Sequence, residues 1–129
     1  MPGSSTPPHE PRDLAYLWDM LMAAREITYF CRGSNLETYA RNRLLQRAVE
    51  RNLQILGDAA KRISNRTREA SPTVPWKGIV GQRNVIVHDY AEIDPERVWR
   101  LVESEMEPLQ SHLEALLSHL DPGSRNISR

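Results

Sequence analysis

The sequence predicts an all-α protein, an up-and-down bundle of four main helices that leaves room for an additional short helix. Apolar residues recur at spacings of three and four along several segments, which is the periodicity of amphipathic helices. Prolines and glycines separate these segments, at the points where helices start and stop. No segment shows the apolar–polar alternation of a strand, and the sequence has no internal repeat. A bundle of antiparallel helices satisfies this pattern.

Length and composition indicate one globular domain. The 129 residues are enough to bury a core, and 40% of them are hydrophobic and 26% charged. No run approaches eighteen apolar residues, so no membrane span is predicted. The start, "MPGSSTPPHEPR", lacks the apolar region of a secretory signal. We expect a disordered Pro-rich leader over 1–12, a helical domain over 13–120 and a flexible tail over 121–129.

The cysteine content limits the possible chemistry. Cys31 is alone, which excludes an intramolecular disulfide and favours a reducing, cytoplasmic location. We expect it to be a small buried side chain near a helix end. Neither paired cysteines nor an HExxH or DxD pattern is present, so no metal and no cofactor are predicted.

The first half of the domain contains two predicted helices. The first begins with Asp13 as N-cap and stops at Gly33. The second opens near Ser34 or Asn35, with Glu37 closing a capping box on Ser34. This longer helix turns an apolar track inward: Leu45, Val49, Leu53, Leu56, Ala60 and Ile63.

Gly57 lies in the middle of this second helix. Glycine in a helix interior costs about 1 kcal/mol relative to alanine. Its presence predicts a place where another helix crosses closely.

Two further helices follow the break "SPTVP". Pro75 suits the first turn of a helix over "PWKGIVGQRNVIVHDY", with inward positions Ile79, Val80, Val85 and Ile86. The last helix starts with Asp94 as cap and Pro95 at its first position, and should kink at Pro108. Its inward track comprises Val98, Leu101, Val102, Met106 or Leu109, Leu113, Leu116 and Leu117.

Aromatic and histidine residues outside the third helix have structural interpretations. Trp76 is expected to anchor the core, and Trp18 and Trp99 to be packing or interface residues. His112 and His119 are seven residues apart, which predicts a solvated stripe on the last helix rather than a metal site.

The net charge is zero, but the charges are segregated. Residues 41–68 contain eight basic side chains against Glu50 and Asp58, whereas residues 92–121 contain eight acidic ones against Arg97 and Arg100. Two solvated, mutually attracting faces explain this pattern. A basic stripe that meets phosphates explains it equally well.

The stretch "GQRNVIVHDY" (81–90) gathers an arginine, a histidine and a tyrosine. An arginine can bind a phosphate bidentately, and a histidine can carry a proton near neutral pH. On an ideal helix, however, Arg83 and His88 are about 140° apart. They converge if the helix ends near His88, or if two copies of the protein meet there. Spacing alone leaves a structural and a catalytic His88 both open.

This stretch and its flanks resemble the HEPN-superfamily ribonucleases, specifically the HepT-like toxins. "RNVIVHDY" is their Arg-x4-His-x-Tyr motif. "AVERNLQILGDAAKRIS" (48–64), "VPWKGIVGQRNVIVHDY" (74–90) and "IDPERVW" (93–99) resemble the helices around that motif. The resemblance covers roughly residues 13 to 120.

The resemblance implies a metal-independent endoribonuclease that acts as a homodimer and as the toxin of a two-gene module. Arg83 and His88 correspond to the catalytic pair, and Asn84 to a supporting polar residue. The implied partners are RNA and a minimal nucleotidyltransferase antitoxin, which attaches AMP to the motif tyrosine, here Tyr90. An attached AMP adds bulk and negative charge where an RNA phosphate would sit. We expect exposed apolar residues such as Trp18, Met22 and Trp99 to form the dimer contact.

An alternative of a different class remains at this point. The chain could be a non-catalytic helical subunit that binds a nucleotide or RNA and accompanies a nucleotidyltransferase. Comparison of RNA cleavage by the wild type and by His88→Ala separates the two functions.

Overall fold

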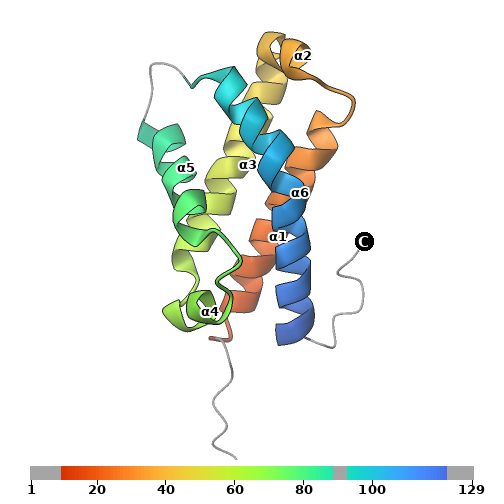
Figure 1. Cartoon of the computed structure of the whole chain (residues 1–129). Helices are drawn as coiled ribbons and strands as arrows, with labels where there is room; N and C mark the ends of the chain where they lie inside the picture. The colour runs from red at the N-terminus through yellow and green to blue at the C-terminus, as the bar shows by residue number, and fades with distance from the viewer. Residues whose placement is uncertain (1–9, 89–92, 122–129) are drawn as a thin grey trace, which may run out of the picture.

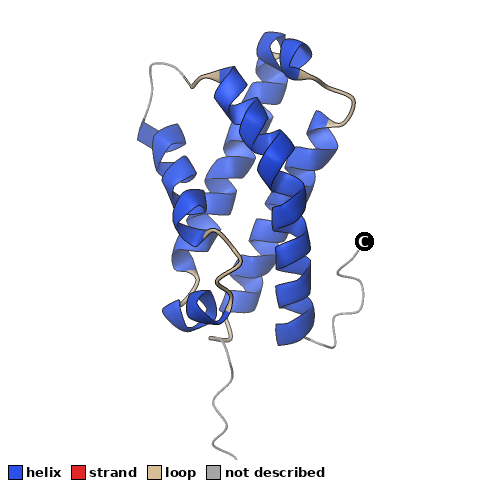
Figure 2. Cartoon of the chain, in the orientation of Figure 1, coloured by secondary structure: helices blue, strands red, loops and turns tan. Residues whose placement is uncertain are grey.

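The computed structural model describes residues 10–88 and 93–121, with the side chains of 84–88 left out of the description. Within these residues the chain is helical and contains no strand (Figures 1 and 2). The elements are α1 (Asp13–Cys31), α2 (Leu36–Arg41), α3 (Arg43–Arg62), α4 (Asn65–Ala70), α5 (Trp76–His88) and α6 (Pro95–Leu120). The predicted leader lies largely, and the predicted tail almost wholly, outside the described residues.

Four long helices form the bundle, as the sequence predicted. α1 packs against α3 on one side and α6 on the other, and α3 also packs against α5 (Figure 1). The short helices α2 and α4 lie at opposite ends of the bundle, at the two ends of α3. α5 therefore reaches the rest of the protein chiefly through α3.

The core is built from the predicted tracks. All six positions predicted for residues 45–63 are buried, as are most of those on α6. Leu101 and Leu116 are only partly buried against the core. Trp76 is buried as predicted, and its indole N–H donates to the Ser71 carbonyl at 3.1 Å. Trp99 is also buried, so the expectation that it is an exposed dimer contact is wrong.

The predicted second helix is wrong in one respect, because it is divided in two at Asn42. The backbone of Asn42 is extended, and its side chain accepts from the amide of Leu45, which starts α3. The capping box of α2 pairs Asn35 with Thr38, not Ser34 with Glu37. Asparagine competes with helix by bonding to nearby backbone, and it favours caps for that reason.

Asp13 does not cap α1, contrary to the prediction, and is the first residue of that helix. Its buried carboxylate accepts hydrogen bonds from the hydroxyls of Ser64 and Thr67 at 2.6 and 2.5 Å, and from the Ser64 amide at 3.1 Å. Asp13 therefore ties the start of α1 to the start of α4. This contact spans about fifty residues, and sequence spacing does not reveal it.

Several smaller predictions are confirmed. Gly33 terminates α1 with a φ of 80°, in the left-handed region that favours glycine. Asp94 caps α6, with Pro95 in its first turn. α6 runs from Pro95 to Leu120 as one helix that continues through Pro108, where the kink stays a prediction. His112 and His119 are exposed on α6, as a solvated stripe requires. None of the described helices is both long enough and apolar enough to cross a bilayer.

Candidate active site

The motif residues belong to α5 as far as they are described. Arg83, Asn84 and His88 lie on this helix, but the side chains of Asn84 and His88 are not described. Tyr90 lies outside the described residues. The side chains of Val85 and Ile86, predicted to point inward, are not described either. The geometry of the site is therefore built from Arg83 and its surroundings.

α5 is positioned by a close crossing with α3 at Gly57. A Cβ atom added at Gly57 would overlap the Cβ of Arg83, lie 2.7 Å from its Cγ, and lie 3.2 Å from the carbonyl oxygen of Ile79. Ile79 and Arg83 are four residues apart on α5, one turn from each other, and the atoms that approach Gly57 are the backbone carbonyl of Ile79 and the side chain of Arg83. The sequence prediction of a helix crossing at Gly57 is confirmed, and the residue that occupies the space is Arg83.

Asp58 binds Arg83 across the same crossing. The Nε–H of Arg83 donates to Oδ1 of Asp58 at 2.5 Å, and the two side chains are 23% and 41% exposed. The pair is thus at the edge of the bundle, reachable from solvent but partly shielded from it. Charge-assisted hydrogen bonds of this kind are shorter and stronger than neutral ones.

Sequence reasoning did not identify Asp58 as a site residue. It is one of two acidic residues in the otherwise basic segment 41–68, and it directly follows the glycine of the predicted crossing. These two features are the signal in the sequence that could have indicated Asp58 as a site residue. The partner could not be assigned, because Asp58 and Arg83 are 25 residues apart in the chain.

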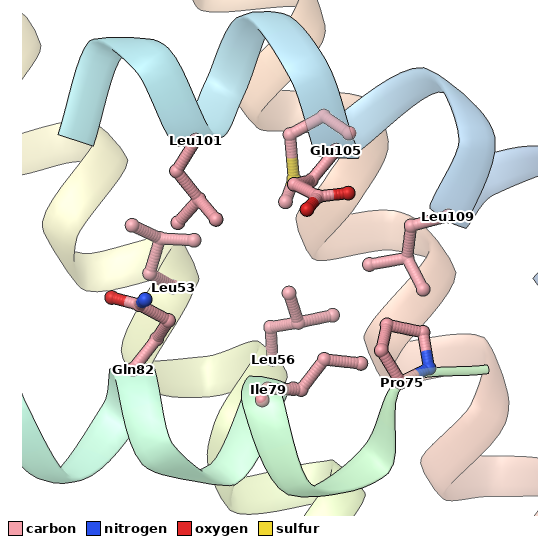
Figure 3. A pocket seen from close by; sticks show the side chains of 10 residues that line it. Leu53, Leu56, Pro75, Ile79, Gln82, Leu101, Glu105 and Leu109 are labelled. Carbon is pink, nitrogen blue, oxygen red and sulfur yellow. The ribbon is translucent and has the colours of Figure 1, made fainter. Parts of the chain in front are cut away.

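A pocket lies between α5 and α6, with α3 as part of its wall (Figure 3). It has a volume of about 160 Å³, and its walls come from α3, α5, α6 and Pro75. Leu53, Leu56 and Ile79 project into it, with Gln82 and Glu105 as polar residues. Its apolar lining does not suit a phosphate.

The outer surface of α3 carries arginines at a spacing of four. Arg43, Arg47 and Arg51 are exposed, and they follow one stripe of the helix. Arg47 pairs with Glu50 at 2.9 Å, and Arg51 donates to Gln54 at 2.9 Å. These side chains place positive charge on the helix that also carries Asp58.

Two further reactive side chains, Cys31 and Tyr39, are buried in the core. Burial raises the pKa of Cys31 to about 11. Burial, together with the nearby charge of Glu50 and the Cys31 thiol, raises the pKa of Tyr39 well above its usual range. Among the described residues, no group of three or more His, Cys, Asp and Glu side chains is arranged to hold a metal ion.

An all-helical bundle whose fifth helix carries an Arg-x4-His pattern is the arrangement expected of an HEPN-like ribonuclease domain. The family model described as "Ribonuclease HepT-like" matches residues 20–116, and the chain belongs to this family.

Individual relatives agree with this assignment. "Putative RNase MJ1380" of Methanocaldococcus jannaschii is 34% identical over 100 residues, which cover 78% of this chain and 92% of the relative. "Probable ribonuclease HepT" of Thermococcus cleftensis is 31% identical over 101 residues, with 78% and 92% covered. "Putative RNase TTE0752" of Caldanaerobacter subterraneus is 28% identical over 102 residues, with 79% and 91% covered. No solved structure shows significant similarity to the chain.

Proposed function

We propose that the protein is a metal-independent endoribonuclease in which Arg83 and His88 are the catalytic pair and Asn84 supports them. The observation that carries the proposal is the position of Arg83. This residue of the family motif is held by α3 at the edge of the bundle, where a polyanion can approach it. The family assignment over residues 20–116 supports the same conclusion.

The proposed reaction is transfer of the RNA phosphodiester to the neighbouring 2′-hydroxyl. The 2′-hydroxyl gives its proton to a water molecule and its oxygen bonds to phosphorus, while the bond from phosphorus to the 5′-oxygen breaks. His88 supplies the proton that the leaving 5′-oxygen needs. Arg83 neutralises the charge that develops on the phosphoryl oxygens. The products are a 2′,3′-cyclic phosphate and a 5′-hydroxyl.

The proposed active form is a homodimer. On an ideal helix, positions 83 and 88 are about 140° apart, and two copies that face one cleft would bring one arginine and one histidine together. Exposed apolar side chains are available for such a contact: Met22, Tyr29, Phe30 and Leu44. Trp18 is partly buried and can contribute an edge.

The proposed biological role is the toxin of a toxin–antitoxin pair. The partner is a minimal nucleotidyltransferase that transfers AMP to the hydroxyl of Tyr90. Tyr90 is two residues beyond His88, so an AMP group there would place a phosphate beside the catalytic pair. Its negative charge and volume would exclude an RNA phosphate.

Cleavage of a defined single-stranded RNA tests the ribonuclease proposal. The wild type is expected to cut in excess EDTA and to leave a 2′,3′-cyclic phosphate, while a 2′-deoxy substitution at the cut site prevents cutting. Arg83→Ala and His88→Ala should each lower the rate on the order of 100-fold or more. Lys77→Ala is the matched control, because Lys77 is exposed on α5 outside the motif. Cutting of the 2′-deoxy substrate, or full activity of His88→Ala, would contradict the mechanism.

A further inference from the structure

Arg83 is fixed by α3 at two points along its side chain. Its Cβ and Cγ lie against Gly57, where no side chain intervenes. Its Nε is bound by Oδ1 of Asp58, the next residue of α3. An arginine side chain has many rotamers, so a mobile arginine would have to be ordered at the moment of substrate binding. These two contacts order it beforehand.

α5 depends on this contact for its position. Its main packing partner is α3, and an apolar pocket lies between α5 and α6 (Figure 3). The crossing at Gly57 and the ion pair with Asp58 therefore fix the position of Arg83 relative to α3. A displacement of about 1 Å at a catalytic group can cost on the order of 100-fold in rate.

The negative charge of Asp58 is unexpected beside a site that binds RNA. A carboxylate beside a site for a polyanion repels that polyanion and weakens its binding. Asp58 is 41% exposed, so this repulsion would act on an approaching RNA. A negative charge at this position is therefore unfavourable for RNA binding unless it improves the placement of the arginine that binds the phosphate.

We infer that Asp58 is the positioning residue for Arg83: it does not contact the substrate, and it holds the guanidinium where the scissile phosphate binds. The inference rests on the proposed ribonuclease function. It assigns to α3 a part in a site whose motif lies on α5. Gly57 supplies the close approach, and Asp58 supplies the orientation.

Two substitutions at Asp58 test the inference by kinetics. Asp58→Ala removes the acceptor and should lower kcat on the order of tenfold or more. Asp58→Asn keeps a neutral acceptor for the Nε–H and should retain a larger part of the activity. Asp19→Asn is the matched control, because Asp19 is an exposed carboxylate on α1. Unfolding midpoints of all variants show whether a loss of activity is accompanied by a loss of fold.

The affinity for a non-cleavable RNA, with a 2′-deoxy nucleotide at the cut site, gives a second readout. The two roles of Asp58 predict opposite changes in this affinity when Asp58 is replaced by alanine. If Asp58 is only a surface charge, Asp58→Ala should tighten RNA binding. If it positions Arg83, Asp58→Ala should weaken binding in the wild-type background and tighten it in an Arg83→Ala background, where no guanidinium remains to be placed.

The outcomes separate the two proposals. A wild type that does not cut RNA overturns the proposed function. A wild type that cuts RNA, with Asp58→Ala as active and as well bound as the control, overturns the positioning role of Asp58 and leaves the ribonuclease intact. Weakened binding by Asp58→Ala to the same extent with and without Arg83 also overturns it, because the effect would then not pass through the arginine.

Discussion

Arg83 on α5 lies directly against the backbone of Gly57 on α3, in space that the side chain of any other residue at position 57 would occupy. The motif arginine is therefore the residue that α5 places at the helix crossing predicted for Gly57. This contact also explains why a helix interior tolerates a glycine at this position.

Replacement of Gly57 by alanine should move α5. The new methyl group would overlap Arg83 and approach the Ile79 carbonyl, so we expect a loss of about 1–3 kcal/mol in the free energy of unfolding. RNA cleavage should fall with it. Gly78→Ala is the control on α5, because a Cβ there meets nothing within 4 Å. That variant should gain up to about 1 kcal/mol from helix propensity. Urea unfolding of both variants checks the pair, and equal stability of the two would refute the crossing.

Asp13 should make stability depend on pH in the acid range. Burial of the carboxylate raises its pKa, but the hydrogen bonds from Ser64, Thr67 and two backbone amides together outweigh that effect and hold the pKa below the usual 3.8. The folded state thus binds this proton less readily than the unfolded state. The stabilisation is present above about pH 4 and is lost as the pH falls through the folded pKa.

Asp13→Asn should reduce this dependence. At neutral pH the variant should be about 1–3 kcal/mol less stable than the wild type, and the difference should narrow as the pH falls below about 4. Thermal or urea unfolding as a function of pH measures it. Asp19→Asn, on the exposed side of α1, should follow the wild-type curve. A difference between Asp13→Asn and wild type that stays constant with pH would contradict the assigned role of the carboxylate.

Cys31 should resist alkylation in the folded protein. Burial raises the pKa of its thiol to about 11, and the thiolate is the reactive form. At pH 8 the folded chain should react slowly with iodoacetamide and rapidly once unfolded in denaturant. Ser118→Cys in a Cys31→Ala background should react at once, because position 118 is exposed. Equal rates at both positions in the folded state would show that the end of α1 is open.

Tyr90→Phe should separate regulation from catalysis. The substitution removes the hydroxyl that would accept AMP and leaves the ring, so some RNA cleavage should persist. Co-expression with the nucleotidyltransferase should add AMP mass to the wild type and not to the variant, as intact-mass measurement would show. AMP found on Tyr90→Phe would place the modification on another residue.

Light scattering should give the mass of a dimer at micromolar concentration. Leu44 is 82% exposed and Tyr29 66%, so both side chains are available to contact a second copy of the chain. Leu44→Lys and Tyr29→Lys should shift the equilibrium toward monomer if these residues form the contact. A wild-type monomer at that concentration would instead remove the basis for a shared site.

Periodicity and the chemistry of caps by themselves determined most of the bundle. The tracks of α3 and α6, the stop at Gly33 and the cap at Asp94 follow from local side-chain physics, which a sequence displays directly. The Arg-x4-His-x-Tyr motif likewise lies within eight consecutive residues, and it indicated the family to which the chain belongs.

Only the tertiary structure decided which distant groups meet. The pairing of Asp13 with Ser64 and Thr67 and that of Asp58 with Arg83 join residues on different helices, and helical spacing gives no information about such partners. The sequence did not predict the division between α2 and α3 at Asn42, for a related reason. Tyr39 is buried beside Trp99 of α6, with their ring centroids 5.4 Å apart, and Asn42 caps α3. Local propensity could continue the helix or end it there, and packing against a residue far along the chain selects between the two.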